Sequence, residues 1–209
     1  MILNIHGFSG NGNNSKYKWL CENIPYHDIY SPSLNYVSEN PQSILDHLLD
    51  RIDFYLRENA DNPMGVYVVG NSMGGFFARS INQILQSVTA LLINPSLAPF
   101  LTLRKHLGDR QCQSYLNLLA RYAYKDERDN WERLHVLLGD SDEVIDHEKL
   151  TKPLLPENFK NLYTIRDGMH SLDMTPEVEN IFRAVIKTPE EMTDGSPRPI
   201  HHYGEKKLS

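Results

Sequence analysis

The chain has 209 residues, which at roughly 150 residues per domain is typical of one domain with a small insertion or tail. Hydrophobic residues make up 40% of the chain and charged residues 23%, an ordinary globular composition that excludes a disordered, collagenous or coiled-coil protein. Lys and Arg number 21 against 27 Asp and Glu, a net charge of −6. Because binding to phosphate backbones requires a broad basic surface, we expect no nucleic-acid partner.

No stretch of the sequence reaches the ~18 to 20 consecutive apolar residues that a membrane-spanning helix needs. Residues 1–20 also lack the apolar segment of a signal peptide. We therefore expect a cytoplasmic protein without a membrane span. The two cysteines, Cys21 and Cys112, lie outside any C-x-x-C pattern, and we interpret both as buried hydrophobic positions rather than as disulfide or zinc ligands.

Six short apolar runs, each ended by turn residues, predict strands. They lie at residues 1–5, 28–30, 65–70, 89–93, 135–138 and 162–165. Helices are predicted at residues 15–23, at residues 42–56, and from the 71–75 turn to about Gln86. We expect Ser15 to cap the first helix and Pro41 to lie in the first turn of the second. This alternation is typical of an α/β fold with a mainly parallel sheet and helices on both faces.

Two regions depart from the alternation. Residues 99–130 are rich in leucine and tyrosine and are helical in pattern, and we interpret them either as a partial lid that forms one wall of a substrate pocket or as ordinary packing. From about Thr188 the chain has few aliphatic residues, so we expect one domain over residues 1–187 and a flexible tail over residues 188–209. The pair His201-His202 in this tail favours solvated residues over a metal site.

The segment Gly70-Asn71-Ser72-Met73-Gly74 matches the pattern G-x-S-x-G. In a nucleophile elbow this pattern forms a strained turn between a strand and a helix, and glycines two positions before and after the serine let the backbone pack closely. Here the segment follows a predicted strand and opens a predicted helix, so Ser72 is predicted to be a nucleophile. The alternative is a glycine turn with an incidental serine.

A serine nucleophile needs a histidine base that is oriented by a carboxylate, and in α/β-hydrolases the order along the chain is Ser, acid, His. His170 follows the last predicted strand, after Gly168, and is our candidate base. Four acidic residues, Asp140, Asp142, Glu143 and Asp146, follow the strand at 135–138. We favour Asp142 over Asp140, which we interpret as a turn residue. The histidines interpreted as surface or structural residues are His27, His47, His106, His135 and His147.

An oxyanion hole requires two backbone N–H donors, one after the nucleophile and one in the loop after the first core strand. The candidates are Met73 and Phe8, with Gly7 allowing the loop to approach and His6 bracing it. The glycines of this loop fit neither G-x-x-x-x-G-K-[ST] nor G-x-G-x-x-G. We therefore expect no nucleotide or other cofactor, and no metal.

The ordered motifs H-G-F, G-N-S-M-G-G, N-P, G-D-S-D-E-V-I-D and G-M-H resemble those of the YqiA-like esterases, a family of small bacterial α/β-hydrolases also called UPF0227. The resemblance covers residues 1 to about 187. Residues 94–100 look like the family's N-P-x-x-x-P-F segment, and residues 142–146 look like its D-E-V-L-D segment, which supports Asp142. The resemblance implies carboxylesterase activity on short acyl esters, extending to thioesters such as acyl-CoA. Residues 104–130 and the tail depart most from the pattern.

Together these observations predict a minimal α/β-hydrolase with about six strands, since the first predicted strand starts at residue 1. Its catalytic triad would be Ser72, Asp142 and His170, and its substrate a small acyl ester or thioester. Two alternatives stay open. The same triad can serve an amidase, a peptidase or an acyltransferase, and the fold can also carry a binding module without catalysis.

Overall fold

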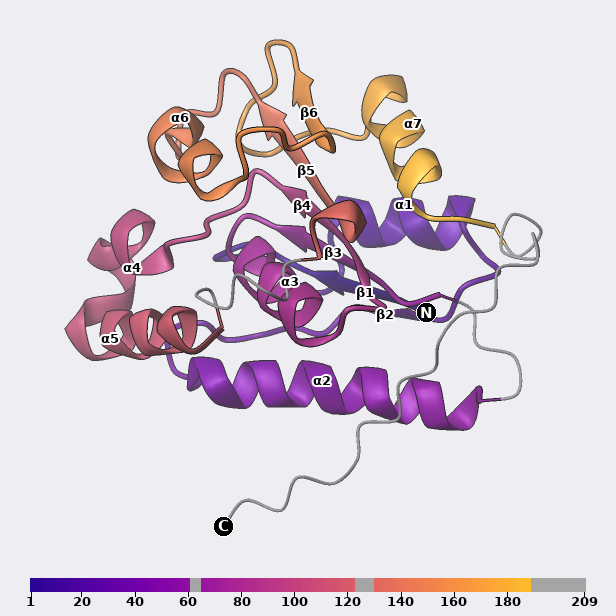
Figure 1. The fold of residues 1–209 in the computed structure, drawn as a ribbon, viewed down its shortest axis with the longest axis horizontal. Coiled ribbons are helices and arrows are strands. Elements are labelled where there is room, and N and C mark those ends of the chain that lie inside the picture. Colours follow the sequence, from indigo (N-terminus) through magenta and orange to yellow (C-terminus); the bar gives the residue numbers. More distant parts are fainter. Residues whose placement is uncertain (61–64, 123–129, 189–209) are drawn as a thin grey trace.

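The structure is a computed structural model that describes residues 1–60, 65–122 and 130–188. Its centre is a six-stranded sheet in the order β2-β1-β3-β4-β5-β6 (Figure 1). The strands are β1 (Ile2–Ile5), β2 (Ile29–Tyr30), β3 (Tyr67–Asn71), β4 (Thr89–Ile93), β5 (Leu134–Gly139) and β6 (Leu162–Ile165). All neighbouring strands run parallel. The predicted α/β class and the predicted sheet are therefore confirmed.

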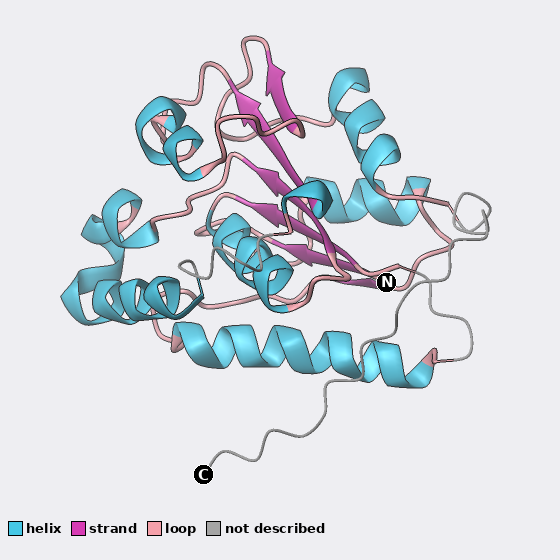
Figure 2. Ribbon diagram, viewed as in Figure 1, coloured by secondary structure: helices cyan, strands magenta, loops and turns pink. Residues whose placement is uncertain are grey.

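Helices connect the strands and cover both faces of the sheet (Figure 2). They are α1 (Ser15–Asn23), α2 (Pro41–Glu58), α3 (Met73–Ile84), α4 (Pro99–Thr102), α5 (Arg104–Tyr122), α6 (His147–Leu150) and α7 (Pro176–Val185), with the 3₁₀ turns η2 (Trp131–Arg133) and η3 (Lys152–Leu154). The cap of α1 differs from the prediction. Asn14, not Ser15, is the N-cap, because its extended backbone lets its side-chain oxygen accept from the Tyr17 N–H at 3.0 Å.

Strand residues that alternate along the chain build two separate cores, because successive side chains point to opposite faces of a sheet. On one face, Val68, Leu92 and Val136 pack with α2, α3 and α5. On the other face, Val69 and Leu137 belong to a smaller core with residues of α1 and α7. Figure 1 shows these two layers of helices on either side of the strands. The four central strands β1, β3, β4 and β5 are buried on both sides, which explains why they read as continuous apolar runs, whereas the edge strands β2 and β6 are partly exposed.

The described part of the 99–130 region packs into the larger core. Helix α5 has a kink at Gly108, where φ is 72° and ψ is 164°. Its buried side chains are Leu107, Cys112, Tyr115 and Leu118. The Tyr115 ring meets the rings of Phe76 and Phe77 edge to face, at centroid distances of 5.5 and 6.2 Å. These contacts are those of a core helix, and the role of this region as a pocket wall stays a prediction. Residues 123–129 lie outside the described residues.

The two cysteines differ in their surroundings. Cys112 is buried as predicted, but Cys21 is exposed. The prediction for Cys21 was wrong because the buried face of α1 runs through Lys16, Trp19 and Leu20, so that Cys21 turns to solvent. Across the described parts of the chain, no helix has the length and apolar character needed to cross a membrane. The predicted tail beyond Thr188, with His201 and His202, lies outside the described residues.

Candidate active site

Ser72 occupies the sharp turn between β3 and α3. Its backbone has φ 50° and ψ −115°, a conformation that non-glycine residues rarely adopt. Hydrogen bonds on both sides hold the turn: the Ser72 N–H donates to the Ile93 carbonyl at 2.8 Å, and the Ser72 carbonyl accepts from Gly75 and Ser96, each at 2.9 Å. The side chain is therefore presented from a strained turn that the surrounding backbone fixes, at the carboxyl end of the strands.

The glycines of the elbow are required by close backbone contacts. A Cβ added at Gly70 would lie 2.5 Å from the carbonyl oxygen of Gly74, and one added at Gly74 would overlap the Ile5 carbonyl oxygen. At Gly75, a Cβ would lie 2.6 Å from Pro95 Cβ. The predicted supporting glycines Gly70 and Gly74 thus stand where β3, α3 and β1 approach too closely for any side chain.

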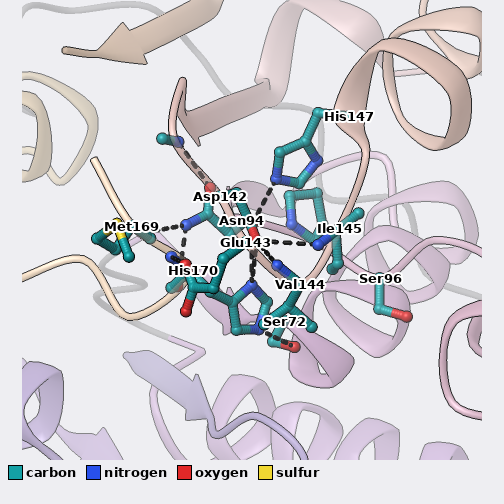
Figure 3. Close-up of polar contacts among 12 residues, drawn as sticks. Ser72, Asn94, Ser96, Asp142, Glu143, Val144, Ile145, His147, Met169 and His170 are labelled. Atoms are coloured by element: carbon teal, nitrogen blue, oxygen red, sulfur yellow. Dashed lines mark hydrogen bonds and ion pairs between the residues drawn. The ribbon is translucent and has the colours of Figure 1, made fainter. Parts of the chain in front are cut away.

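Ser72, His170 and Asp142 form a continuous hydrogen-bonded chain (Figure 3). Ser72 Oγ lies 3.0 Å from His170 Nε2, and His170 Nδ1 lies 2.8 Å from Asp142 Oδ2 and 3.1 Å from Oδ1. Because a carboxylate only accepts, His170 Nδ1 carries the proton, which leaves Nε2 as the acceptor of the serine hydroxyl proton. This is the geometry in which an imidazole can take a proton from a serine as it attacks.

Asp142 lies in the loop after β5, and its side chain is only 1% exposed. Burial by itself would raise the pKa of its carboxyl, but hydrogen bonds from His170 and from the backbone N–H groups of Ile145 and Val144 outweigh burial and lower that pKa below its ordinary value. The two backbone bonds to Oδ1 measure 2.9 and 2.8 Å. Asp142 is therefore an ionised acceptor at neutral pH.

Among the described residues of this loop, the other carboxylates form no hydrogen bond with the His170 ring. Asp140 is exposed and accepts from the Ser141 hydroxyl at 3.1 Å, while Asp146 caps α6. Glu143 accepts from the backbone N–H of His170 at 2.9 Å, and this bond lowers the pKa of the Glu143 carboxyl. Of the four acidic candidates, Asp142 is the one whose carboxylate the structure places against the imidazole, and its role as the catalytic acid stays a prediction.

Two further residues at the site escaped sequence reasoning. The first is His147, the first residue of α6, which we had interpreted as a surface or structural residue. It is buried, and its Nε2 lies 2.8 Å from Asp142 Oδ2. Its Nδ1 lies 2.8 Å from the hydroxyl of Thr151. The signal that could have found it is its position five residues after the acid, at the start of a helix that Asp146 caps.

The second is Asn94, which directly follows β4 and is fully buried with φ 40°. Its side-chain oxygen accepts from the Gly139 N–H at 2.7 Å. Its amide nitrogen donates to the carbonyls of Met169 and His170, both at 2.9 Å. One asparagine thus ties the end of β4 to the end of β5 and to the loop that carries His170. The N-P pair after the strand was visible in the sequence, but it gave no indication of these partners.

The two candidate oxyanion donors lie on either side of the elbow. Met73 is the first residue of α3, so its N–H has no acceptor within the helix and lies at the positive end of the helix dipole. Phe8 lies in a turn closed by the Gly10 N–H and the Gly7 carbonyl at 3.1 Å. A Cβ on Gly7 would lie 3.1 Å from Ser72 Cβ, so the turn passes directly beside the candidate nucleophile.

His6 anchors this turn and is not free to exchange protons with a ligand. Its Nε2 accepts from the Leu34 N–H at 2.9 Å, so its Nδ1 donates to the Gly7 carbonyl at 2.7 Å. The Tyr36 hydroxyl donates to the His6 carbonyl at 2.6 Å. Burial lowers the pKa of His6, which keeps the imidazole neutral in this role.

The parallel sheet, the elbow at the end of β3 and the chain order Ser72, Asp142, His170 are those of an α/β-hydrolase fold. Solved structures agree. Est1E from Butyrivibrio proteoclasticus, with ferulic acid bound, has a TM-score of 0.64 at 16% identity, covering 86% of this chain and 85% of that chain. A Paleococcus ferrophilus monoacylglycerol lipase has a TM-score of 0.58 at 15% identity, covering 88% and 91%. MGS-MChE2, an alpha/beta hydrolase from a metagenome of Mar Chica lagoon sediments, has a TM-score of 0.55 at 19% identity, covering 87% of each chain.

Sequence comparison places the chain within a family. The model of UPF0227, described as an uncharacterised protein family, matches residues 1–183, and the chain belongs to this family. No curated protein matches the sequence. The family membership predicted from the ordered motifs is confirmed.

Proposed function

We propose that the protein is a serine hydrolase that cleaves a carboxylic ester or thioester through an acyl-enzyme formed on Ser72. The observation that carries the proposal is the unbroken chain from Ser72 Oγ through the His170 imidazole to the Asp142 carboxylate, with steps of 3.0 and 2.8 Å. In that arrangement a weakly acidic hydroxyl becomes a nucleophile at neutral pH.

In the proposed reaction, Ser72 Oγ attacks the acyl carbon while its proton moves to His170 Nε2. The ionised Asp142 stabilises the imidazolium that results, and the N–H groups of Met73 and Phe8 donate to the oxyanion. When the tetrahedral intermediate collapses, the bond to the leaving alcohol or thiol breaks and His170 returns the proton to it. Water then attacks the acyl-enzyme with His170 as base, which releases the acid and restores Ser72.

The choice of an ester or thioester is supported by the resemblance of the ordered motifs to an esterase family and by the fold shared with esterases and lipases. Of these neighbours, Est1E has ferulic acid bound and the Paleococcus ferrophilus protein is a monoacylglycerol lipase. We propose a carboxylic ester or thioester as the bond cleaved here, with short acyl groups as the first substrates to test.

The experiment compares one acyl group on three leaving atoms: p-nitrophenyl acetate, acetyl-CoA and p-nitroacetanilide. The expected result is turnover of the ester or the thioester, with an acetyl adduct on Ser72 in the intact mass and a loss on the order of 10⁴-fold in Ser72→Ala. Turnover of the anilide alone would make the protein an amidase. Transfer of the acetyl group to an added alcohol in preference to water would make it an acyltransferase. Equal activity in Ser72→Ala would reject the mechanism.

A further inference from the structure

The Asp142 carboxylate is shared between two histidines, and only one of them has a role in the proposed reaction. His147 Nε2 and His170 Nδ1 each lie 2.8 Å from the same oxygen, Asp142 Oδ2. Figure 3 shows the carboxylate between the two rings, with His170 extending onward to Ser72 and His147 extending away from it. The side chains of His147 and Asp142 are 6% and 1% exposed, so this contact is shielded from water.

The partners of His147 determine which of its nitrogens carries the proton. An ionised carboxylate accepts only, so Nε2 must donate to Asp142. In the neutral ring Nδ1 then accepts, and the Thr151 hydroxyl, fully buried and 2.8 Å away, is the donor. The other acceptor available to that hydroxyl is the Pro95 carbonyl, which is farther away at 3.4 Å. Thr151 therefore holds His147 in the Nε2–H form that Asp142 requires.

We propose that His147 is a positioning residue of the hydrolase: by donating to Asp142 Oδ2, it fixes the orientation of the carboxylate and moderates the basicity of His170. This inference rests on the proposed function. The physical reason is competition for one oxygen. A donor on Oδ2 stabilises the carboxylate and weakens its attraction for the His170 imidazolium. Removing that donor leaves a more basic carboxylate, which binds the His170 imidazolium more strongly, and also frees the carboxylate to rotate.

The surroundings of His147 keep its ring neutral at neutral pH. Burial is the largest influence and lowers the pKa of His147. The hydrogen bond that His147 donates to Asp142 and the charge of that carboxylate oppose burial, and the charges of His170 and Lys152 lower the pKa further. A hollow of about 410 Å³ borders the ring on the side of α6. The charged groups that line this hollow with His147 are Asp140, Asp142, Glu143, Asp146, Glu148 and Lys152.

The test uses His147→Leu, which removes the donor, and His147→Gln, whose amide can still donate to Asp142. The matched control is His135→Leu, because His135 is a partly buried histidine on β5 that contacts Tyr163 rather than the candidate site. The probe is a fluorophosphonate, and the measured quantity is its rate constant for labelling Ser72 between pH 5 and 9. Folding of each variant is checked by urea unfolding.

We expect His147→Leu to label about ten-fold more slowly at pH 7, and the acidic limb of its pH profile to move to higher pH because the base has become harder to deprotonate. His147→Gln should recover most of the rate, and His135→Leu should label like the wild type. An unchanged rate and profile in folded His147→Leu would overturn the proposal. Equal losses in the Leu and Gln variants with an unmoved profile would also overturn it, since they indicate packing alone.

A second measurement does not depend on labelling. In ¹⁵N-histidine NMR spectra, His147 should show the Nε2–H tautomer, and the ring-nitrogen chemical shifts of His170 at pH 7 should move toward those of an imidazolium in His147→Leu. If the Leu variant does not fold, Thr151→Val serves instead, because it removes the hydroxyl that holds the tautomer while keeping the side-chain volume. Ring-nitrogen chemical shifts of His170 that are the same with and without the His147 donor would contradict the inference. If the wild type does not label at Ser72 but the His147 substitution still changes the NMR signals of His170, only the proposed function is rejected.

Discussion

The side-chain amide of Asn94 donates to the backbone carbonyl of His170 at 2.9 Å, across 76 positions of the sequence. The end of β4 therefore fixes the position of the candidate base independently of Asp142. The same amide bonds the Met169 carbonyl, and the Asn94 oxygen accepts from Gly139. Through this one side chain, the loops after β5 and β6 are held in register with the elbow.

Replacing Asn94 by Asp should slow the labelling of Ser72 in a protein that still folds. The carboxylate keeps the bond from the Gly139 N–H but presents an oxygen to the two carbonyls, so the His170 loop loses its anchor. We expect a labelling rate at least ten-fold lower and a loss of about 2 kcal/mol in the free energy of unfolding. The control is Asn82→Asp, a fully buried asparagine that donates to Val88 away from the site. The Asn82→Asp variant should lose stability and keep its labelling rate. Equal decreases in the labelling rates of the Asn94 and Asn82 variants would contradict the anchoring role.

The choice among the acidic residues gives a second prediction. Asp142→Asn removes the charge that stabilises the His170 imidazolium and should lower turnover by a factor on the order of 10⁴. Asp140→Asn changes an exposed residue two positions away and should leave turnover within two-fold. Steady-state kinetics on the best substrate of the acetyl series measure both. Comparable losses of turnover in the two variants would mean that turnover depends on the conformation of the loop rather than on the Asp142 carboxylate.

A third prediction concerns the packing beneath the elbow. Gly74→Ala places a methyl group against the carbonyls of Ile5 and His6, where neither strand nor helix can shift without moving the other. We expect a loss of more than about 3 kcal/mol in the free energy of unfolding, measured in urea. Gly108→Ala is the control and should be less destabilising: its backbone at φ 72° and ψ 164° disfavours alanine by about 1–3 kcal/mol, but no atom lies within 4 Å of the added Cβ. Similar urea-unfolding midpoints for Gly74→Ala and Gly108→Ala would show that the elbow tolerates a side chain at position 74.

His135 should make stability depend on pH in a defined window. Burial, assisted by the charge of Lys187, lowers its pKa from the ordinary 6.5 to about 4. The unfolded chain therefore binds the proton more readily than the folded one, and stability falls as pH decreases from about 6.5 towards 4. Since the ring is partly exposed, we expect about 1–2 kcal/mol between pH 7.5 and 5.

The variant that isolates this effect is His135→Gln, which cannot titrate. Urea unfolding of wild type and variant at pH 7.5 and pH 5 gives the difference in the free energy of unfolding at each pH. The variant is expected to be the less stable at pH 7.5, since it loses the stacked contact with Tyr163. That difference should narrow at pH 5. A difference that stays constant with pH would assign the acid sensitivity to other groups.

Features that depend on local pattern were predictable from the sequence. Buried parallel strands read as apolar runs, and the elbow was visible because its glycines and serine are contiguous and lie between a strand and a helix. Asp142 was selected by its place in the loop and by the resemblance of the following residues. The predicted N-cap of α1 was wrong by one residue because Asn14 and Ser15 are both good capping residues, and only the backbone decides between them.

The residues that were missed act through contacts distant in the sequence. Asn94 reaches Gly139 and His170, and no local pattern indicates which carbonyls a buried amide will meet. His147 lies close to Asp142 in sequence, but its role depends on whether the short helix α6 folds back over the acid, which the sequence does not specify. The burial of His147 and its hydrogen bond with Thr151 both depend on the position of α6 in the fold.

The most direct measurement of the central claim is fluorophosphonate labelling with mass mapping on the wild type, Ser72→Ala and His170→Ala, because it requires no knowledge of the substrate. The account predicts a single phosphonyl adduct on Ser72 of the wild type and none on either variant. An unlabelled wild type, or label on a residue other than Ser72, would contradict a serine hydrolase built on Ser72, His170 and Asp142.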